Sequence, residues 1–219
     1  MKRHILIALI LIITAIYGQA QSISEDSGKA RDVLESLNKQ FNESKMLQID
    51  FLLTYDNRQT DEKFDYKGHL DVTGVKFHLK IPQSETFCDG TNIWNYSPDN
   101  KEVTISAIEE SERDAMSPMS FITSWQNGYK LRYLGEAKID GLQCAEVDLY
   151  PEDHNSNIVR IRITIEKQGN KLRKILNQTK DGLLMTYKIE KIQYCNSVTI
   201  DTFQFDSNKF PGVEVVDMR

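Results

Sequence analysis

The sequence has few of the residues that usually carry catalysis or cross-linking. Only three cysteines and four histidines occur among 219 residues, and so few cysteines rule out a disulfide-stapled miniprotein. No His-Glu-x-x-His, Cys-x-x-Cys, Gly-x-Ser-x-Gly, phosphate-loop or dinucleotide-binding glycine motif is present. We therefore expect a protein that is not an enzyme, with no catalytic residues, no metal site and no cofactor.

The charged residues exclude further classes of function. Lys and Arg total 27 against 32 Asp and Glu, so the formal net charge is −5, and no Lys/Arg-rich block occurs. A chain this acidic is a poor candidate for binding nucleic acid or an anionic membrane surface. The acidic run at residues 109–114 could imitate the carboxylate pair of a glycosidase. Consecutive carboxylates in a polar stretch are more typical of a solvated loop, which is what we expect here.

The first 20 residues have the pattern of a secretory signal. Met1-Lys2-Arg3-His4 is a basic start, residues 5–16 are apolar except for Thr14, and Gly18-Gln19-Ala20 provides the small residues that a signal peptidase recognises. Residues 5–16 are too few to cross a hydrocarbon core of ~30 Å as a helix. We expect cleavage before Gln21, with residues 1–20 as signal peptide and 21–219 as one soluble, exported domain. A buried N-terminal helix is the alternative.

Apolar residues then follow a helical period once and a strand period many times. Residues 24–42 predict a helix, because apolar side chains recur there at spacings of three and four. After Met46 the period changes to two, as in 47–55, 64–72, 75–81, 159–165 and 183–189. Asp-Gly pairs at 89–90, 140–141 and 181–182 are hairpin turn signals. The pattern predicts ten or eleven short strands, joined mostly as hairpins in an antiparallel meander.

One segment interrupts the meander. Ser117 and Pro118 fit the first positions of a helix, Met119, Ile122 and Trp125 share its apolar face, and Gly128 can end it. A short apolar helix inserted into a β-meander has to cover something, so we expect this helix, over residues 118–126, to lie on the sheet.

The predicted helices are too small to cover a sheet of this size. A sheet with one apolar face must bury that face on a second sheet, on helices or by curling. We therefore expect a mainly β (α+β) fold, in which a strongly curved antiparallel sheet is plugged by the two helices. Its interior either holds a hydrophobic cavity large enough for a ligand or is simply filled by side chains, and periodicity does not separate the two.

The cysteines leave two possibilities open. Cys88, Cys144 and Cys195 lie on or beside predicted strands. In an oxidising compartment one disulfide could form, and Cys144–Cys195 is the pairing we favour. Three buried thiols are the alternative.

Several motifs in order resemble the LolA family of periplasmic lipoprotein carriers. The segment Cys88-Asp89-Gly90-Thr91-Asn92-Ile93-Trp94-Asn95-Tyr96 is similar to a hairpin of that family, and residues 117–122 resemble its lid helix. Phe203-Gln204-Phe205 followed by residues 210–217 is similar to its C-terminal ending. The style of the sequence resembles Bacteroidetes members. Where proteobacterial members have an Arg-Pro pair that helps to hold the lid shut, this chain has Thr73-Gly74-Val75.

The resemblance implies a fold and a function. The fold would be an incomplete β-barrel whose helices form a lid over a hydrophobic cavity. The function would be that of a monomeric periplasmic chaperone, which takes acylated lipoproteins from an inner-membrane ABC transporter to the outer membrane, where the acceptor is unspecified. A lipid- or lipoprotein-sensing envelope-stress module on the same scaffold is the alternative.

The apolar strand faces supply the candidate ligand-binding residues. We expect the cavity to be lined by the apolar side chains of the predicted strands, namely Phe51, Leu53, Tyr55, Tyr66, Phe77, Leu79, Trp94 and Tyr96. Met119, Ile122 and Trp125 are the expected lid residues, and the alternative for them is a fixed core helix.

Overall fold

A single twelve-stranded sheet dominates the computed structural model, which describes residues 26–108 and 125–219. The sheet contains one strand more than the upper limit that the alternation predicts. In chain order the strands are β1 (Met46–Asn57), β2 (Glu62–Thr73), β3 (Lys76–Ile81), β4 (Ser84–Cys88), β5 (Asn92–Ser97), β6 (Glu102–Ala107), β7 (Tyr129–Ile139), β8 (Leu142–Pro151), β9 (Ile158–Glu166), β10 (Lys171–Thr179), β11 (Leu183–Cys195) and β12 (Glu214–Asp217).

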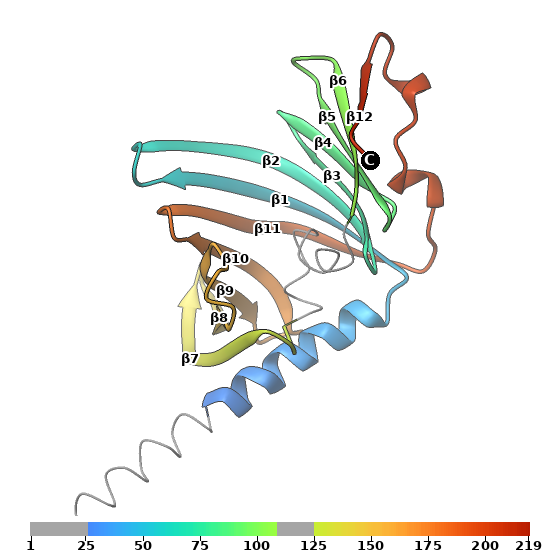
Figure 1. Ribbon diagram of the computed structural model, residues 1–219. Coiled ribbons are helices and arrows are strands. Elements are labelled where there is room, and N and C mark those ends of the chain that lie inside the picture. Colours follow the sequence, from blue (N-terminus) through green and yellow to red (C-terminus); the bar gives the residue numbers. More distant parts are fainter. Residues whose placement is uncertain (1–25, 109–124) are drawn as a thin grey trace, which may run out of the picture.

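The sheet is built from two meanders joined side by side. Strands β1 to β6 form one run of antiparallel neighbours and β7 to β11 the other. β11 returns to pair with β1 along almost the whole of both strands, which unites the halves. The short β12 adds to β6 in parallel. The sheet curls strongly but leaves β12 and β7 as open edges, so it forms an incomplete barrel (Figure 1).

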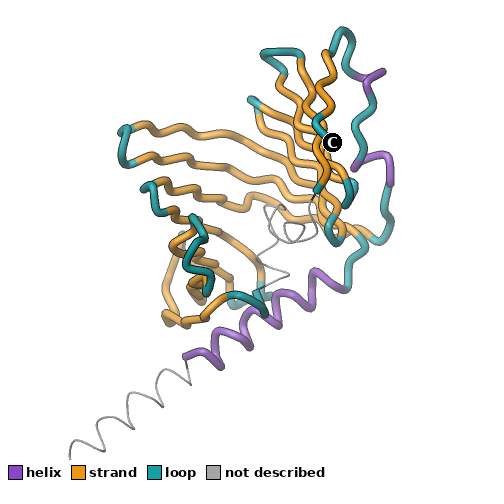
Figure 2. The backbone as a smooth tube through the Cα atoms, in the orientation of Figure 1, coloured by secondary structure: helices purple, strands orange, loops and turns teal. Residues whose placement is uncertain are grey.

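One helix covers part of the concave side of this sheet. It is described over residues 26–42, within the predicted range, and lies across the open side of the curve (Figure 2). Ala30, Leu34, Leu37 and Phe41 are buried at helical spacing in one cluster with the inward-facing strand residues. Burial of this apolar stripe therefore explains why the segment is helical and where it docks. No helix in the described ranges is long and apolar enough to cross a membrane.

A segment that follows β11 packs on the convex side. Two short 3-10 turns, η1 (Ile200–Phe203) and η2 (Ser207–Lys209), lead from β11 to β12. Phe203 is fully buried there although it lies outside the concave core cluster. The convex face of the first meander thus has a small apolar core of its own.

The three cysteines are free. The Cys144–Cys195 disulfide is therefore a wrong prediction. Cys144 lies on β8 and Cys195 at the end of β11, and β9 and β10 separate these strands in the sheet. The sulfur atoms of residues on strands so far apart are beyond the reach of a disulfide bond.

Candidate functional site

The apolar face of β1 forms the centre of the concave surface. Leu53 lies opposite Tyr66 of β2 on one side and opposite Tyr187 of β11 on the other. Residues that face each other across a ladder point to the same side of the sheet, so these three side chains share the concave face. Phe51 and Tyr55 fall on it as well, because they alternate with Leu52 and Thr54 along β1.

Phe51 lies over Gly68 of the neighbouring strand. A Cβ atom built at Gly68 would be 2.3 Å from Cζ of Phe51, so only glycine leaves room for the ring. The ring also packs edge-on against Tyr187, with 5.5 Å between centroids. A missing side chain on β2 therefore lets one aromatic ring bridge three strands.

Apolar surface extends beyond the part that the helix covers. Near the β1–β2 and β10–β11 turns the concave side chains are only half-buried, and Phe64 is 45% exposed. We call this region the distal apolar face; it comprises Tyr55, Phe64, Tyr66, Leu79, Ile81, Met185 and Tyr187. Its aromatic rings contact one another, as in the pair Phe64–Tyr66 with centroids 6.2 Å apart. Burial raises the pKa of Tyr187, as an apolar setting should.

A polar side chain, Asn177 of β10, lies within this surface. It faces Ile161 on one side and Met185 on the other, so it points to the concave side. Its Oδ1 atom is buried and has no hydrogen-bond partner among the described residues. A buried acceptor of this kind is costly unless a ligand or water supplies a donor.

The register places six of the eight predicted lining residues together. Phe77 faces Val72, and Leu79 faces Leu70, both on the concave side. With Phe51, Leu53, Tyr55 and Tyr66 they form one continuous apolar wall, in which Phe51, Leu53 and Phe77 are buried and the others are half-buried.

Trp94 and Tyr96 do not belong to this wall, and their predicted place on it is wrong. Trp94 faces Phe87, and Phe87 in turn faces His78, which puts Trp94 on the convex side. Ile93 holds the concave position on β5 instead. Each face of β5 is covered, with Ile93 on the concave side and Trp94 and Tyr96 on the convex side, so the more apolar phase of this strand is not the concave one.

The convex aromatic residues pack under the C-terminal segment. The ring of Tyr96 lies 4.6 Å from that of Phe210, and Phe205 stacks on Phe210 with 4.7 Å between centroids. Phe87 meets both of these rings edge-on. Tyr96 therefore anchors the C-terminal segment to the sheet.

Of the predicted lid residues, only Trp125 is described. It is fully buried, in the same core cluster as the helix over residues 26–42, and the Arg31 guanidinium lies 5.3 Å from its ring centroid. Its indole nitrogen is buried without a partner in the described part of the chain. Met119 and Ile122 lie outside the described residues, so the lid stays a prediction.

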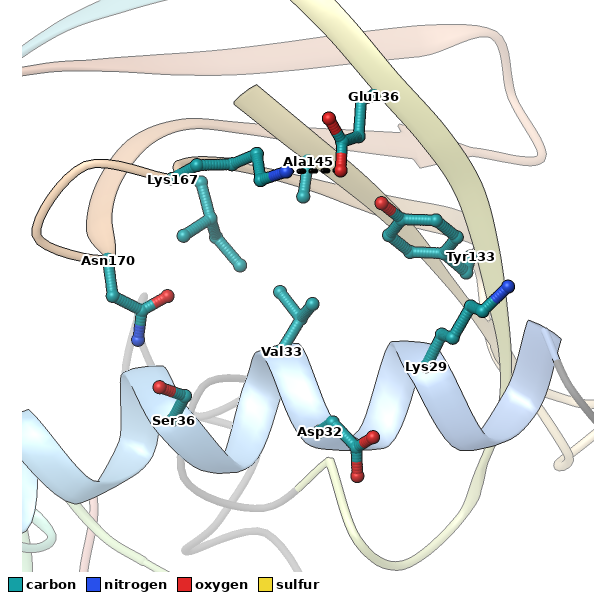
Figure 3. A pocket seen from close by; sticks show the side chains of 10 residues that line it. Lys29, Asp32, Val33, Ser36, Tyr133, Glu136, Ala145, Lys167 and Asn170 are labelled. Carbon is teal, nitrogen blue, oxygen red and sulfur yellow. Dashed lines mark hydrogen bonds and ion pairs between the residues drawn. The ribbon is translucent and has the colours of Figure 1, made fainter. Parts of the chain in front are cut away.

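A pocket of about 580 Å³ opens between the helix and the β7–β10 end of the sheet (Figure 3). Its apolar part is formed by Val33, Ala145 and Ile165. Its rim is charged, and an ion pair between Lys167 and Glu136 spans it. This pocket shares no residue with the distal apolar face. No sequence pattern indicates it, because its walls come from four separate segments.

An ionic cluster occupies the convex side of β2, β3 and β4. His78 Nε2 lies 2.8 Å from Glu85 Oε1, and His78 Nδ1 lies 3.8 Å from Asp71 Oδ2. Burial lowers the pKa of His78, but the hydrogen bonds and charges of these two carboxylates outweigh it and raise the pKa overall. In turn, the hydrogen bond from His78 lowers the pKa of Glu85. Among the described residues, no group of His, Cys, Asp or Glu is arranged to hold a metal ion.

Sequence reasoning missed part of the distal apolar face. Met185, Tyr187 and Ile81 were visible as alternating apolar residues, but nothing in the pattern paired β11 with β1. Phe64 was visible in the same way on β2.

The sequence matches the family described as outer membrane lipoprotein carrier protein LolA over residues 42–206. That match covers most of the chain. The chain belongs to the LolA family. The curled, open sheet with its helix on the concave side is therefore the LolA-family fold, as the resemblance implied.

Individual relatives of this LolA-family chain are distant. An outer-membrane lipoprotein carrier protein of Histophilus somni is 30% identical over 138 residues, which cover 63% of this chain and 62% of that protein. An uncharacterized protein of Methanocaldococcus jannaschii is 21% identical over 206 residues, which cover 93% of this chain and 58% of that protein. The chain thus spans about three fifths of the length of these curated relatives.

A solved structure supports the fold alone. The crystal structure of an uncharacterized conserved protein from Thermus thermophilus matches with a TM-score of 0.57 at 13% identity. The match covers 86% of this chain and 99% of that one.

Proposed function

We propose that this protein is a periplasmic carrier, which binds the acyl chains of lipoproteins on its concave apolar surface and moves them from the inner to the outer membrane. The observation that carries the proposal is the distal apolar face. Half-buried aromatic and aliphatic side chains remain there, packed against the core cluster to which the helix contributes but not covered by the helix. A protein that only needed a stable core would gain by burying them fully.

The free energies involved agree with a carrier. Exposing an acyl chain of about fifteen methylenes to water costs on the order of 12 kcal/mol. A carrier that moves through water must offset most of this cost yet still release the chain, so a surface that is apolar but incompletely enclosed is suitable. The unpartnered Asn177 Oδ1 adds an acceptor for the amide N–H of an N-acylated chain.

The remaining steps of the route are part of the same proposal, which family membership and the N-terminal pattern support. In this proposal residues 1–20 direct export and are cleaved, and the monomeric carrier receives its cargo from an inner-membrane ABC transporter. It then passes the cargo to an acceptor at the outer membrane. The chemistry needs no cofactor, because cargo is bound and released without any covalent step.

Leu53→Glu tests the proposal, with Leu52→Glu as matched control. Leu53 faces the concave surface, whereas Leu52 faces the convex side between Lys67 and Lys188. A carboxylate at 53 would place a charge where acyl chains bind and would cost several kcal/mol or draw in water. We expect the Leu53 variant to lose release of acylated lipoprotein from inner-membrane vesicles, and the Leu52 variant to keep it.

Folding must be checked alongside transfer. Leu53 is only 9% exposed, so Tyr66→Glu, at a half-buried position of the same face, serves as a second variant. Circular dichroism and thermal unfolding should show both variants folded. If the two variants fold and still release lipoprotein as the unchanged protein does, the concave face is not the cargo site. A folded protein that binds lipoprotein but transfers none would favour the sensing module.

A further inference from the structure

Strand β7 is an open edge of the sheet. It runs from Tyr129 to Ile139 and, among the described strands, pairs with β8 alone, whereas the opposite edge, β12, is the short strand of residues 214–217. An edge strand of this length presents backbone N–H and C=O groups that another chain can pair with. A register shift between Tyr133 and Gly135 divides it, so residues 129–133 form its regular part.

The hydrogen-bond phase shows which backbone groups face outward. The N–H of Glu152 donates to the carbonyl of Gly128 at 2.8 Å, so this pair is a hydrogen-bonded position of the ladder. Because bonded and non-bonded pairs alternate in an antiparallel ladder, Tyr129, Leu131 and Tyr133 direct their backbone groups away from β8. Pro151 stands opposite Tyr129, at a position where β8 need not donate.

The two faces of this edge differ in chemistry. Tyr129, Leu131 and Tyr133 are half-buried against the concave core, while Lys130 and Arg132 are exposed on the convex side. Asp148 lies across the ladder from Arg132. Its carboxylate already forms an ion pair with Arg162, in which Arg162 Nε lies 2.7 Å from Asp148 Oδ1. Lys130 and Arg132 form no ion pair with any other residue of the described ranges.

A pocket lies beside the same edge. Tyr133 and Glu136 of β7 are among the residues that line the cavity of about 580 Å³ between the helix and the sheet (Figure 3). Its apolar wall includes Val33 and Ile165. A strand added along β7 would direct alternate side chains to this concave side, where the pocket can take an apolar one.

We propose that residues 129–133 of β7 are a docking edge for an extended segment of a partner protein, in which apolar and acidic residues alternate. The segment pairs with the outward backbone groups of Tyr129, Leu131 and Tyr133. Its apolar side chains continue the concave core and its acidic side chains meet Lys130 and Arg132. In a dimer formed through this edge, Lys130 and Arg132 of one copy would repel those of the other. An acidic segment therefore fits the edge better than a second copy of β7 does.

The test uses an acetylated and amidated peptide of alternating valine and glutamate, labelled for fluorescence anisotropy. Two further probes are a peptide of the same composition with valines and glutamates in separate blocks, and one with lysine in place of glutamate. We expect the alternating acidic peptide alone to bind. Hydrogen exchange should slow in residues 129–133 of the bound protein and remain unchanged in β12.

Two pairs of variants separate backbone pairing from charge. Leu131→Pro removes an outward N–H without touching the β8 ladder, and Leu131→Ala truncates the side chain while keeping that N–H. Arg132→Glu replaces an attractive charge with a repulsive one and should weaken binding about tenfold. Lys209→Glu, in η2, changes the net charge equally and should leave binding unchanged.

The proposal is overturned if the alternating peptide does not bind or if exchange slows elsewhere but not in β7. It is equally overturned if Leu131→Pro and Leu131→Ala bind alike, or if Arg132→Glu and Lys209→Glu weaken binding alike. Binding of a fluorescent acyl probe serves as an independent readout, because the distal apolar face is intact in all four variants.

Discussion

At the scale of single residues, Gly68 determines how Phe51 lies on the concave face. Gly68→Ala should destabilise the protein by about 1–3 kcal/mol, because the added methyl group overlaps the Phe51 ring and forces it out of place. Gly28→Ala is the matched control, since a Cβ there meets nothing within 4 Å and alanine suits a helix better than glycine. Urea unfolding of both variants measures the difference.

A double-mutant cycle gives the prediction its control. Phe51→Leu removes the ring that the new methyl group meets, so Gly68→Ala should cost less in that background. If the alanine costs the same with and without the ring, the contact between residues 51 and 68 does not explain the glycine.

For some single residues, the sequence alone was sufficient to predict the face of the sheet on which the side chain lies. Phe51, Leu53, Tyr55 and Tyr66 could be placed on one face because each belongs to a long strand with a single apolar phase. Trp94 could not, because the phase of β5 that holds Trp94 and Tyr96 is more apolar than the phase of Ile93 and Asn95, yet it faces the convex side. Its direction depends on the C-terminal segment that covers the convex side, which comes much later in the chain.

At the scale of elements, aromatic contacts and the pairing of β12 with β6 hold the C-terminal segment to the sheet. Phe205→Ala removes a ring that packs on Phe87, Tyr96 and Phe210. Because Phe205 is half-buried, we expect a loss of about 1–3 kcal/mol in unfolding free energy. Urea unfolding measures this loss, and Val215→Ala, at a 51% exposed position of β12, should change little.

The same variant tests whether the two faces act separately. Phe205 lies on the convex side and the distal apolar face on the concave side, so binding of an acyl probe should be unchanged in folded Phe205→Ala protein. Loss of acyl binding in a variant that remains folded would show that the convex segment contributes to the ligand site.

Helices and strands were easier to predict from the sequence than the pairing of one strand with another. The helix over residues 26–42 and most strands follow from periodicity, because each element buries one face. The pairing of β1 with β11 joins the beginning of the sheet to a strand near the end of the chain and left no local signal. The pocket beside β7 depends on a long-range arrangement as well, so local patterns could not indicate it.

At the scale of the whole molecule, one curled sheet has two kinds of apolar surface on its concave side. Its helix-covered part is a closed core that supplies stability, while the distal apolar face remains incompletely buried. The ionic cluster around His78 and the C-terminal segment both lie on the convex side, away from the concave surface. In the proposed function, a ligand on the concave surface would therefore not contact the ionic cluster or the C-terminal segment.

The most direct test of the account is photo-crosslinking with a palmitic acid analogue that carries a diazirine near the end of its chain. After irradiation, digestion and peptide mass spectrometry locate the label. We predict labelling within β1, β2 and β11, at peptides containing Tyr55, Tyr66 and Tyr187, with competition by unlabelled palmitate. Labelling confined to the pocket beside β7 or to the C-terminal segment would contradict the claim that the distal apolar face binds acyl chains.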